Sequence, residues 1–269
     1  MTMTMKEHME MMNRIKRGRE PFPEKVKPQI TRQRMATLLT LNNTKIKKGD
    51  KLHDGWKTAI MHLHPNSTKI CPYQDIAKCK TACLNTAGRG GIFKKGETTN
   101  VIQEARKRRT KLFLEAPELF LEQLYEEILK FEAKAKREGK RPCVRLNGTS
   151  DIQWEYQELQ GRTVFDTFPD IQFYDYTKIP TRKISHIKNY HLTWSYSEAN
   201  KKYASWFDKL NYNIAVVFNH ALPLWYKGRK VIDGDKYDQR FLDEPNVVVG
   251  LTAKGKAKKD TSGFVISIT

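Results

Sequence analysis

The chain has 269 residues, enough for one large domain or two small ones, and 39% of them are hydrophobic, which suffices for a core. Lys and Arg number 49 against 30 Asp and Glu, and the net charge of +19 favours an anionic partner, either nucleic acid or an acidic substrate; charge that serves only solubility is the alternative. The apolar runs are far too short to cross a membrane and the N-terminus lacks a signal-peptide core, so we expect neither membrane insertion nor export.

The first 35 residues are predicted to form a basic arm. Lys6–Arg17 fits a helix, after which Pro21, Pro23 and Pro28 favour an extended path. We therefore divide the chain into this arm, residues 1–35, and one α/β domain, residues 36–269.

Strand and helix patterns alternate along the rest of the chain. The six expected strands are Trp56–His64, Cys143–Asn147, Ile171–Tyr176, Tyr190–Ser195, Ile214–Phe218 and Val247–Leu251. The expected helices are Thr99–Leu114, Pro117–Glu138 and Glu198–Leu210. Recurring strand–helix units predict a parallel sheet, which we expect to form a partial, TIM-like (β/α)6 barrel; an open doubly wound sheet is the alternative.

Three of the four cysteines, Cys71, Cys79 and Cys83, fall in one loop directly after the first expected strand. Thiolates are ligands that zinc and iron–sulfur clusters prefer, so we expect these three to hold a metal ion or a cluster. Cys79 and Cys83 are four residues apart, which in a helical turn places both sulfurs on one face, and Pro72 favours an extended approach for Cys71. The spacing C-x7-C-x3-C matches neither the usual zinc knuckle nor the usual ferredoxin run, and the alternative is buried or free thiols, or a disulfide. Cys143, on the second strand, is expected to be a small interior residue.

Polar side chains follow the expected strands at their carboxyl ends, where parallel α/β proteins place their sites. They are His64, Asn147, Gly148, Thr149, Ser150, Asp151, Asp175, Tyr176, Ser195, Ser197, Asn219, His220, Thr252 and Lys254. We expect Asp151 to accept hydrogen bonds from a ligand, and the N-cap of the next turn is the alternative. His64 is a candidate fourth metal ligand or acid–base group; the alternative is a hydrogen-bonded interior histidine, which we favour for His62.

An acidic cluster stands out near the C-terminus of this basic chain. Its members are Asp233, Asp235, Asp238 and Asp243. A cation site is one interpretation, but we favour a glycine-containing turn whose carboxylates pair with Lys230, Lys236 and Arg240.

Four long motifs carry a family resemblance. They are CPYQDIAKCKTACLNTAGRG from Cys71, VIQEARKRRTKLF from Val101, RLNGTSDIQWE from Arg145 and DGDKYDQRFLDEPNVVVGLTAKGKAKKDTSGFV from Asp233. From about residue 55 to the C-terminus the chain resembles the gene product 88 family of bacteriophages, which implies a phage protein of the host bacterial cytoplasm but no particular activity. The scarcity and clustering of cysteine agree with a reducing, cytoplasmic setting.

The order of a strand, three cysteines and a polar second strand end is similar to that of radical S-adenosylmethionine enzymes. That resemblance implies a [4Fe–4S] cluster on Cys71, Cys79 and Cys83, with S-adenosylmethionine at the open iron. The positions matching its contacts are Asn147, Gly148, Thr149, Ser150 and Asp151 for the methionine amino group and Ser195 and Ser197 near the ribose. The usual cysteine spacing in those enzymes is C-x3-C-x2-C, from which this chain departs.

Two functions follow as expectations. The first is a radical S-adenosylmethionine-like enzyme that acts on an anionic substrate, a nucleotide or nucleic acid, with Asp151 and His64 as catalytic residues. The second is a non-catalytic protein that binds nucleic acid or a host factor and carries a structural zinc ion on the three cysteines and His64.

Overall fold

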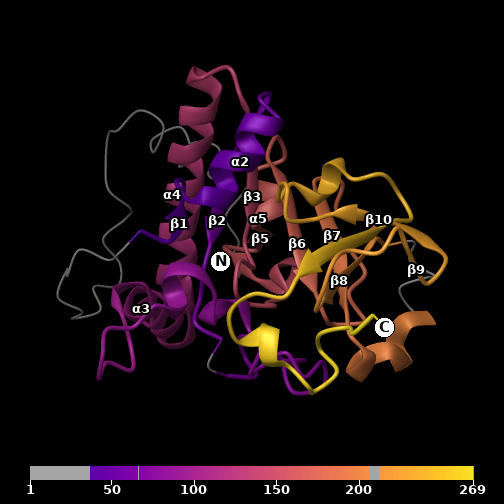
Figure 1. The fold of residues 1–269 in the computed structure, drawn as a ribbon. Coiled ribbons are helices and arrows are strands. Elements are labelled where there is room, and N and C mark those ends of the chain that lie inside the picture. The colour runs from indigo at the N-terminus through magenta and orange to yellow at the C-terminus, as the bar shows by residue number, and fades with distance from the viewer. Residues whose placement is uncertain (1–36, 66, 206–211, 269) are drawn as a thin grey trace, which may run out of the picture.

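The computed structural model describes residues 37–65, 67–205 and 212–268, and the predicted basic arm lies outside these ranges. Its centre is a nine-stranded sheet in the order β1-β2-β3-β6-β7-β8-β11-β10-β9 (Figure 1). The strands of this sheet are β1 (Leu39–Thr40), β2 (Trp56–Met61), β3 (Arg141–Arg145), β6 (Gln172–Thr177), β7 (Tyr190–Tyr196), β8 (Ile214–Phe218), β9 (Trp225–Tyr226), β10 (Arg229–Asp233) and β11 (Val248–Thr252). A separate two-stranded ribbon joins β4 (Glu158–Leu159) to β5 (Arg162–Thr163).

The six strands predicted from the sequence are β2, β3, β6, β7, β8 and β11. They lie side by side in chain order, and each pairs with its neighbour in parallel. The order does not reverse at its centre as it would in a doubly wound sheet. β10 adds a further parallel strand outside β11, whereas β1 and β9 are antiparallel edge strands. The prediction of an α/β fold with a mostly parallel sheet is confirmed, but within the described residues the sheet does not close into a barrel.

The helices are mostly short. The α-helices are α2 (Thr44–Leu52), α3 (Val101–Glu115), α4 (Pro117–Arg137) and α5 (Val164–Thr167). The 3-10 helices are η1 (Leu84–Thr86), η2 (Gly88–Gly91), η3 (Trp154–Tyr156), η4 (Glu198–Tyr203), η5 (Arg240–Leu242) and η6 (Gly255–Lys259). None of the helices among the described residues is both long and apolar enough to cross a bilayer.

The two long helices form where local sequence signals favour them. Asn100 caps α3 by accepting from the main-chain N–H groups of Ile102 and Gln103. Pro117 occupies the first turn of α4, where a missing N–H costs nothing, and basic residues in the last turn suit the helix dipole. Both helices fall where the apolar spacing predicts them, and the predicted apolar stripe of α4 is buried.

The two faces of the sheet are covered differently. On one face, Met61 and Val144 belong to the main apolar core with Phe120 and other side chains of α3 and α4. On the opposite face, Thr58 donates to Asp50 of α2 at 2.5 Å, so α2 covers the β2 end of that face. The alternation of side chains along β2 thus separates an apolar helix-packed face from a polar one.

Two segments differ in part from the helical geometry considered for them. The segment from Cys79 to Cys83 forms turns, so the helical-turn geometry considered for these two cysteines does not occur. The helix expected at Glu198–Leu210 begins as the 3-10 helix η4 and continues as α-helix at Ala204 and Ser205, whereas residues 206–210 lie outside the described ranges. The sequence patterns also did not indicate α2 or the β9–β10 hairpin.

Candidate cysteine site

The cysteine loop follows β2 and is fixed to the carboxyl ends of two other strands. The main-chain N–H of Asp151, after β3, donates to the carbonyl of Ile70 at 2.9 Å. The hydroxyl of Ser197, after β7, donates to the carbonyl of Ala77 at 3.2 Å and is fully buried. The predicted site residues Asp151 and Ser197 therefore do lie at the cysteine loop, and Ser197 contributes by holding its backbone.

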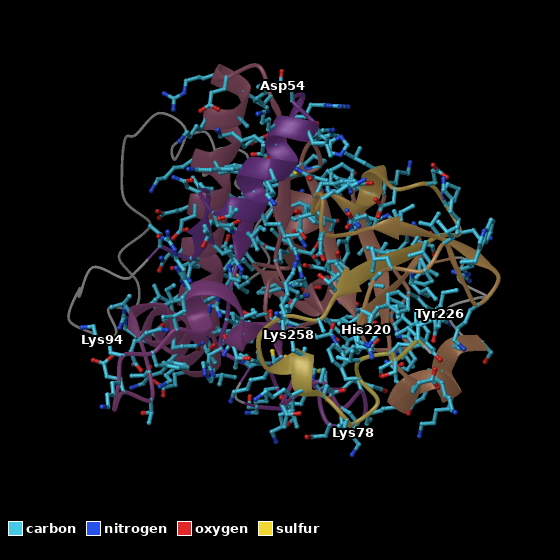
Figure 2. The ribbon with its side chains drawn as sticks, in the orientation of Figure 1. Asp54, Lys78, Lys94, His220, Tyr226 and Lys258 are labelled. Atoms are coloured by element: carbon cyan, nitrogen blue, oxygen red, sulfur yellow. The ribbon has the colours of Figure 1, made fainter. Side chains whose placement is uncertain are left out.

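The C-terminal segment packs over the same loop. Cys79 lies against a small apolar cluster that includes Phe264, and Ser262 Oγ donates to the carbonyl of Lys78 at 3.2 Å. Figure 2 shows Lys78 and Lys258 at the same end of the molecule, where these two distant parts of the chain meet. All three thiols are half-buried, and residues that come last in the sequence cover Cys79.

The backbone after Cys83 is held by the first turns of α3. The side chain of Gln103 donates to the carbonyls of Asn85 and Gly90 at 2.7 and 2.6 Å. A Cβ atom on Gly91 would lie 1.9 Å from the carbonyl oxygen of Thr86, so only glycine fits there. The glycine-rich stretch therefore serves close backbone packing beside the cysteines.

Each thiol has a different backbone partner. The contacts are Cys71 Sγ with the carbonyl of Thr149 at 4.0 Å, Cys79 Sγ with the carbonyl of Gln74 at 3.7 Å, and Cys83 Sγ with the N–H of Asn85 at 3.4 Å. All four cysteines of the chain are reduced. Among the described residues, no group of three or more His, Cys, Asp or Glu side chains is arranged so that it could hold a metal ion as it stands.

Lys178 provides a shared positive charge for the three thiols. Burial alone lowers the pKa of Lys178, but the charge of Asp151, together with the charges of the three thiols once they are ionised, outweighs burial, and the net shift of the pKa is upward. Conversely, burial raises the pKa of each of the three thiols, and Lys178 counteracts this increase in all three. The thiols therefore share one electrostatic environment and are protonated at neutral pH.

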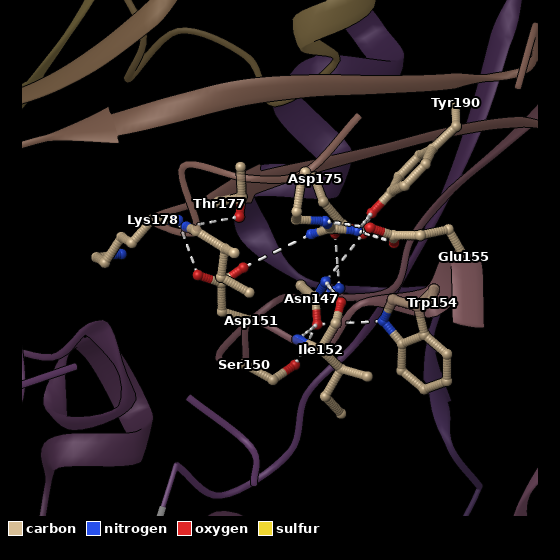
Figure 3. A network of polar contacts seen from close by, with 12 residues as sticks. Asn147, Ser150, Asp151, Ile152, Trp154, Glu155, Asp175, Thr177, Lys178 and Tyr190 are labelled. Atoms are coloured by element: carbon tan, nitrogen blue, oxygen red, sulfur yellow. Dashed lines mark hydrogen bonds and ion pairs between the residues drawn. The ribbon is translucent and has the colours of Figure 1, made fainter. Parts of the chain in front are cut away.

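Asn147 is the hub of the loop after β3 (Figure 3). Its Oδ1 accepts from Ser150 Oγ at 2.8 Å, from the N–H of Ile152 at 3.0 Å and from Trp154 Nε1 at 3.1 Å. Its Nδ2 donates to the carbonyl of Ile152 and to Asp175 Oδ2. The amide is thus fully used within the protein, which explains its burial without a ligand.

Gly148 and Thr149 attach this loop to β2 and to the residues that follow it. The Gly148 N–H donates to the carbonyl of Met61 at 2.9 Å, and a Cβ atom on Gly148 would lie only 2.4 Å from that oxygen. Thr149 Oγ1 donates to the carbonyl of Leu63 at 2.5 Å. These two predicted cofactor contacts therefore have structural partners in this arrangement.

Asp151 differs from its neighbours because one carboxylate oxygen keeps no hydrogen bond. Its Oδ2 accepts from the main-chain N–H of Lys178 at 2.8 Å, whereas its buried Oδ1 lies 3.6 Å from Arg182 Nη1 without a hydrogen bond. Burial raises the pKa of Asp151, and the charges of Arg182 and Lys178 oppose that increase. A surface pocket of about 370 Å³ also reaches Asp151 and includes Lys69 and Pro72 beside the cysteine loop.

A buried ionic network lies beneath Asp151, and the sequence patterns did not predict it. Arg182 has no exposed surface and pairs with Glu155 through two hydrogen bonds of 2.8 and 2.5 Å, while it also donates to Tyr190 Oη at 2.8 Å. Tyr190 in turn donates to Asp175 Oδ2 at 2.9 Å. Burial raises the pKa of Asp175 to about 7, although its donors and nearby arginines counteract this.

The two histidines after β2 have separate surroundings. The N–H of His64 donates to Thr110 Oγ1 on α3 at 2.7 Å, and burial followed by the charges of Lys107 and Arg106 lowers the pKa of His64. Its buried Nδ1 has no hydrogen-bond partner. Burial, and then nearby arginines, lowers the pKa of His62 to about 3, so its ring is neutral as an interior histidine would be. The charges that act on the His64 ring come from α3, and no contact joins the ring to any of the three thiols among the interactions of the described residues.

Ser195 and Cys143 have contacts within the fold. Ser195 is buried, and its carbonyl accepts from Asn200 Nδ2 at 3.0 Å. Cys143 is fully buried with its sulfur 3.3 Å from Thr58 Oγ1.

The carboxylates of the acidic cluster pair with different Lys and Arg side chains and do not converge on one cation site. Asp235 pairs with Lys254, Asp243 lies 3.4 Å from Arg240, and Asp238 pairs with Arg145 and Lys45 at 3.0 and 2.7 Å. The Asp243–Arg240 pair agrees with the predicted turn, whereas the partners of Asp235 and Asp238 lie far away in the sequence.

These features define an α/β protein with a cysteine loop at the carboxyl edge of a parallel sheet. The chain belongs to the gene product 88 family, because the family model described as Gene product 88 matches residues 36–268. No curated protein and no solved structure matches the chain. These comparisons confirm the resemblance to gene product 88 and give no support to the resemblance to radical S-adenosylmethionine enzymes.

Proposed function

We propose that the protein binds a metal centre through Cys71, Cys79 and Cys83. The observation that carries this proposal is that one loop holds all three thiols and is fixed to the ends of β3 and β7 by the bonds from Asp151 and Ser197. The charge of Lys178, which acts on each of the three thiols, agrees with it. Binding requires the thiols to lose their protons and to turn toward one another, since their present arrangement does not hold an ion. The hydrogen bonds that orient the three thiols are long, at 3.4–4.0 Å to backbone atoms, so the sulfurs lose little polar stabilisation when they turn.

We favour an iron–sulfur cluster over zinc. A closed structural zinc site needs a fourth protein ligand, and the expected one, His64, lies against α3. Three thiolates alone would leave one metal position open. In a radical S-adenosylmethionine-like enzyme the three cysteines would hold the cluster and leave its fourth iron free for the cofactor; a reduced cluster would supply the one electron that cleaves a carbon–sulfur bond of the sulfonium. The chain order of the six parallel strands supports this comparison with partial barrels.

Within this proposal, Asp151 is the contact for the cofactor amino group or the substrate. Its Oδ1 is buried without a hydrogen bond and its carboxylate lies close enough to Cys71 to influence the pKa of that thiol. Asn147, Gly148, Thr149 and Ser197 position the surrounding backbone. The net charge of +19 supports an anionic substrate.

Metal analysis after anaerobic reconstitution tests the metal proposal. We expect iron and sulfide to bind with a visible absorption band, and we expect Cys71→Ser, Cys79→Ser and Cys83→Ser each to abolish it. Cys143→Ser is the matched control and should retain the full metal content, because its sulfur lies beside Thr58 on another strand. A wild-type protein that takes up neither iron nor zinc would refute the proposal. A Cys143→Ser variant that loses as much metal as the three loop variants would also refute it.

A second candidate function, nucleic-acid binding, is favoured by the β9–β10 hairpin. Leu224 and Trp225 are 82% and 66% exposed, and the exposed cations Lys227 and Lys230 follow directly. Exposed aromatic rings beside cations stack on single-stranded bases, at about 1–3 kcal/mol per base. Fluorescence anisotropy with a labelled single-stranded DNA should therefore show weaker binding for Trp225→Ala than for the wild type. The exposed Tyr156, on η3, gives the matched control Tyr156→Ala, and equal affinity of all three proteins would exclude this function for the hairpin.

A further inference from the structure

Polar side chains gather on the sheet face opposite α3 and α4. Tyr176 of β6 and Thr193 of β7 are cross-strand partners in register, and His191 precedes Thr193 by two residues on the same face. η5 packs against both strands and brings in Arg240. We call Tyr176, His191, Thr193 and Arg240 the β6–β7–η5 cluster.

This cluster holds several buried polar atoms without a hydrogen-bond partner. They are Tyr176 Oη, His191 Nε2, Thr193 Oγ1, and Nε and Nη1 of Arg240. Thr193 and Arg240 have no exposed surface, whereas Tyr176 and His191 are only partly buried, so the cluster extends toward the outside. Buried polar groups are nearly always paired in native proteins, and several unpaired ones in one place indicate that something outside the chain completes their hydrogen bonds.

The charge around the cluster is positive. Arg145 lies over the ring of Tyr176 at 4.6 Å and pairs with Asp238, which also pairs with Lys45. Arg240 is opposed by Asp243. Three cations therefore face two carboxylates. Burial and the charge of Arg240 lower the pKa of His191 to about 4, so His191 is neutral and able to donate one hydrogen bond.

We propose that the β6–β7–η5 cluster binds the phosphoryl group of a phosphorylated ligand. Every unpaired group in the cluster is able to donate a hydrogen bond. A phosphoryl group accepts hydrogen bonds from several directions through its oxygens, and it binds a guanidinium particularly well. The ligand would bind on the polar face of the sheet. This inference is independent of the proposed metal, because the cluster contains no cysteine and does not involve the cysteine loop.

Inorganic phosphate is the probe that tests the proposal. We expect phosphate to raise the thermal midpoint of the wild-type protein relative to chloride at equal ionic strength, with acetate less effective. Tyr176→Phe and Thr193→Val should each weaken phosphate binding at least about tenfold, the effect of losing one hydrogen bond to a charged group. Without phosphate, both variants should be as stable as the wild type or more so, because each removes a buried hydroxyl that has no partner.

The matched control is Tyr125→Phe. The hydroxyl of Tyr125 donates to the carbonyl of Arg162 at 3.0 Å, so this variant should lose stability and keep its phosphate response. The proposal fails if phosphate has no specific effect on the wild type, or if Tyr176→Phe and Thr193→Val respond to phosphate like the wild type. It also fails if both variants are destabilised as Tyr125→Phe is, since the hydroxyls would then have structural partners.

Discussion

The main-chain N–H of Lys178 donates to Asp151 Oδ2 at 2.8 Å, which joins the residue after β6 to the loop after β3. The charge of the same lysine lowers the pKa of each of the three thiols of the cysteine loop. One residue thereby connects the cysteine loop to the buried ionic network of Asp151, Arg182 and Glu155, and substitutions in either part should be felt in the other.

Removal of the Lys178 charge should slow the reaction of the thiols. Lys178 lowers the pKa of Cys71, Cys79 and Cys83, so Lys178→Met should raise the pKa of all three thiols and reduce their thiolate fraction. Alkylation at about pH 8.5, measured thiol by thiol with mass spectrometry, should therefore be slower in the variant than in the wild type for all three cysteines. Lys80→Met, which removes an exposed lysine of the same loop, should leave the rates unchanged. Unchanged rates in Lys178→Met would show that the ammonium group does not act on the thiols.

Arg182 should be the most sensitive single position for stability. Arg182→Met leaves the buried carboxylate of Glu155 without its partner and removes the donor to Tyr190, at a cost of about 3–5 kcal/mol in the free energy of unfolding. The double variant Arg182→Met with Glu155→Leu should be more stable than Arg182→Met alone, because no unpaired charge then remains buried.

Urea denaturation measures both effects, and the surface pair Lys130–Glu126 supplies the control. Lys130→Met should change the free energy of unfolding by less than about 1 kcal/mol, because that pair is exposed. If Arg182→Met lowers the free energy of unfolding as little as Lys130→Met does, water must reach the buried network.

Sequence patterns predict the architecture well where a local signal is strong. Alternation, apolar runs and helical spacing locate six of the parallel strands and both long helices, because these elements contribute apolar side chains to the core in patterns that are visible in the chain. The parallel strand β10 was not predicted. The β9–β10 hairpin has a weaker signal. Its turn places Lys227 and Gly228 at φ values of +50° and +72°, and a lysine in that conformation is uncommon, so the sequence does not indicate the turn.

The candidate site is only partly visible in the sequence. Clustering in the chain predicts the proximity of Cys71, Cys79 and Cys83, whereas the role of Lys178 depends on where β6 ends relative to the loop after β2. Arg182 lies in an irregular segment and pairs with Glu155, which is 27 residues earlier. A pair of residues so far apart in the chain produces no periodic pattern and no short motif, so the sequence alone does not predict it.

Gly148→Ala should test the close contact between the loop after β3 and the end of β2. A Cβ atom there would lie 2.4 Å from the carbonyl oxygen of Met61 and 2.8 Å from Ile60 Cγ2, so the loop must move. We expect a loss of about 1–3 kcal/mol in the free energy of unfolding, as for other overpacked sites. Gly55→Ala is the control, because its nearest neighbour is the flexible end of Arg141 at 3.7 Å. Equal stability of the two variants would contradict the close packing described for this loop.

Asp175 should make stability fall as the pH rises from about 4 to about 7. Burial raises its pKa to about 7 from an ordinary value of 3.8, so the folded protein binds this proton more tightly than the unfolded chain does. Stability is therefore greatest when the carboxyl is protonated, declines as the pH passes from the unfolded to the folded pKa, and is level above that range. The difference is on the order of 4 kcal/mol, from about three pKa units.

The measurement is the free energy of unfolding of the wild type and of Asp175→Asn at a series of pH values between these limits. Asparagine does not titrate, so the difference between the two proteins isolates this carboxyl from the other groups. The amide also places an N–H₂ group opposite the donors of Asn147 and Tyr190, which lowers the stability of the variant at every pH without changing the slope. The wild type should lose stability relative to the variant as the pH rises. A relative gain over the same range would mean that the three donors to Asp175 outweigh its burial and keep the carboxylate charged.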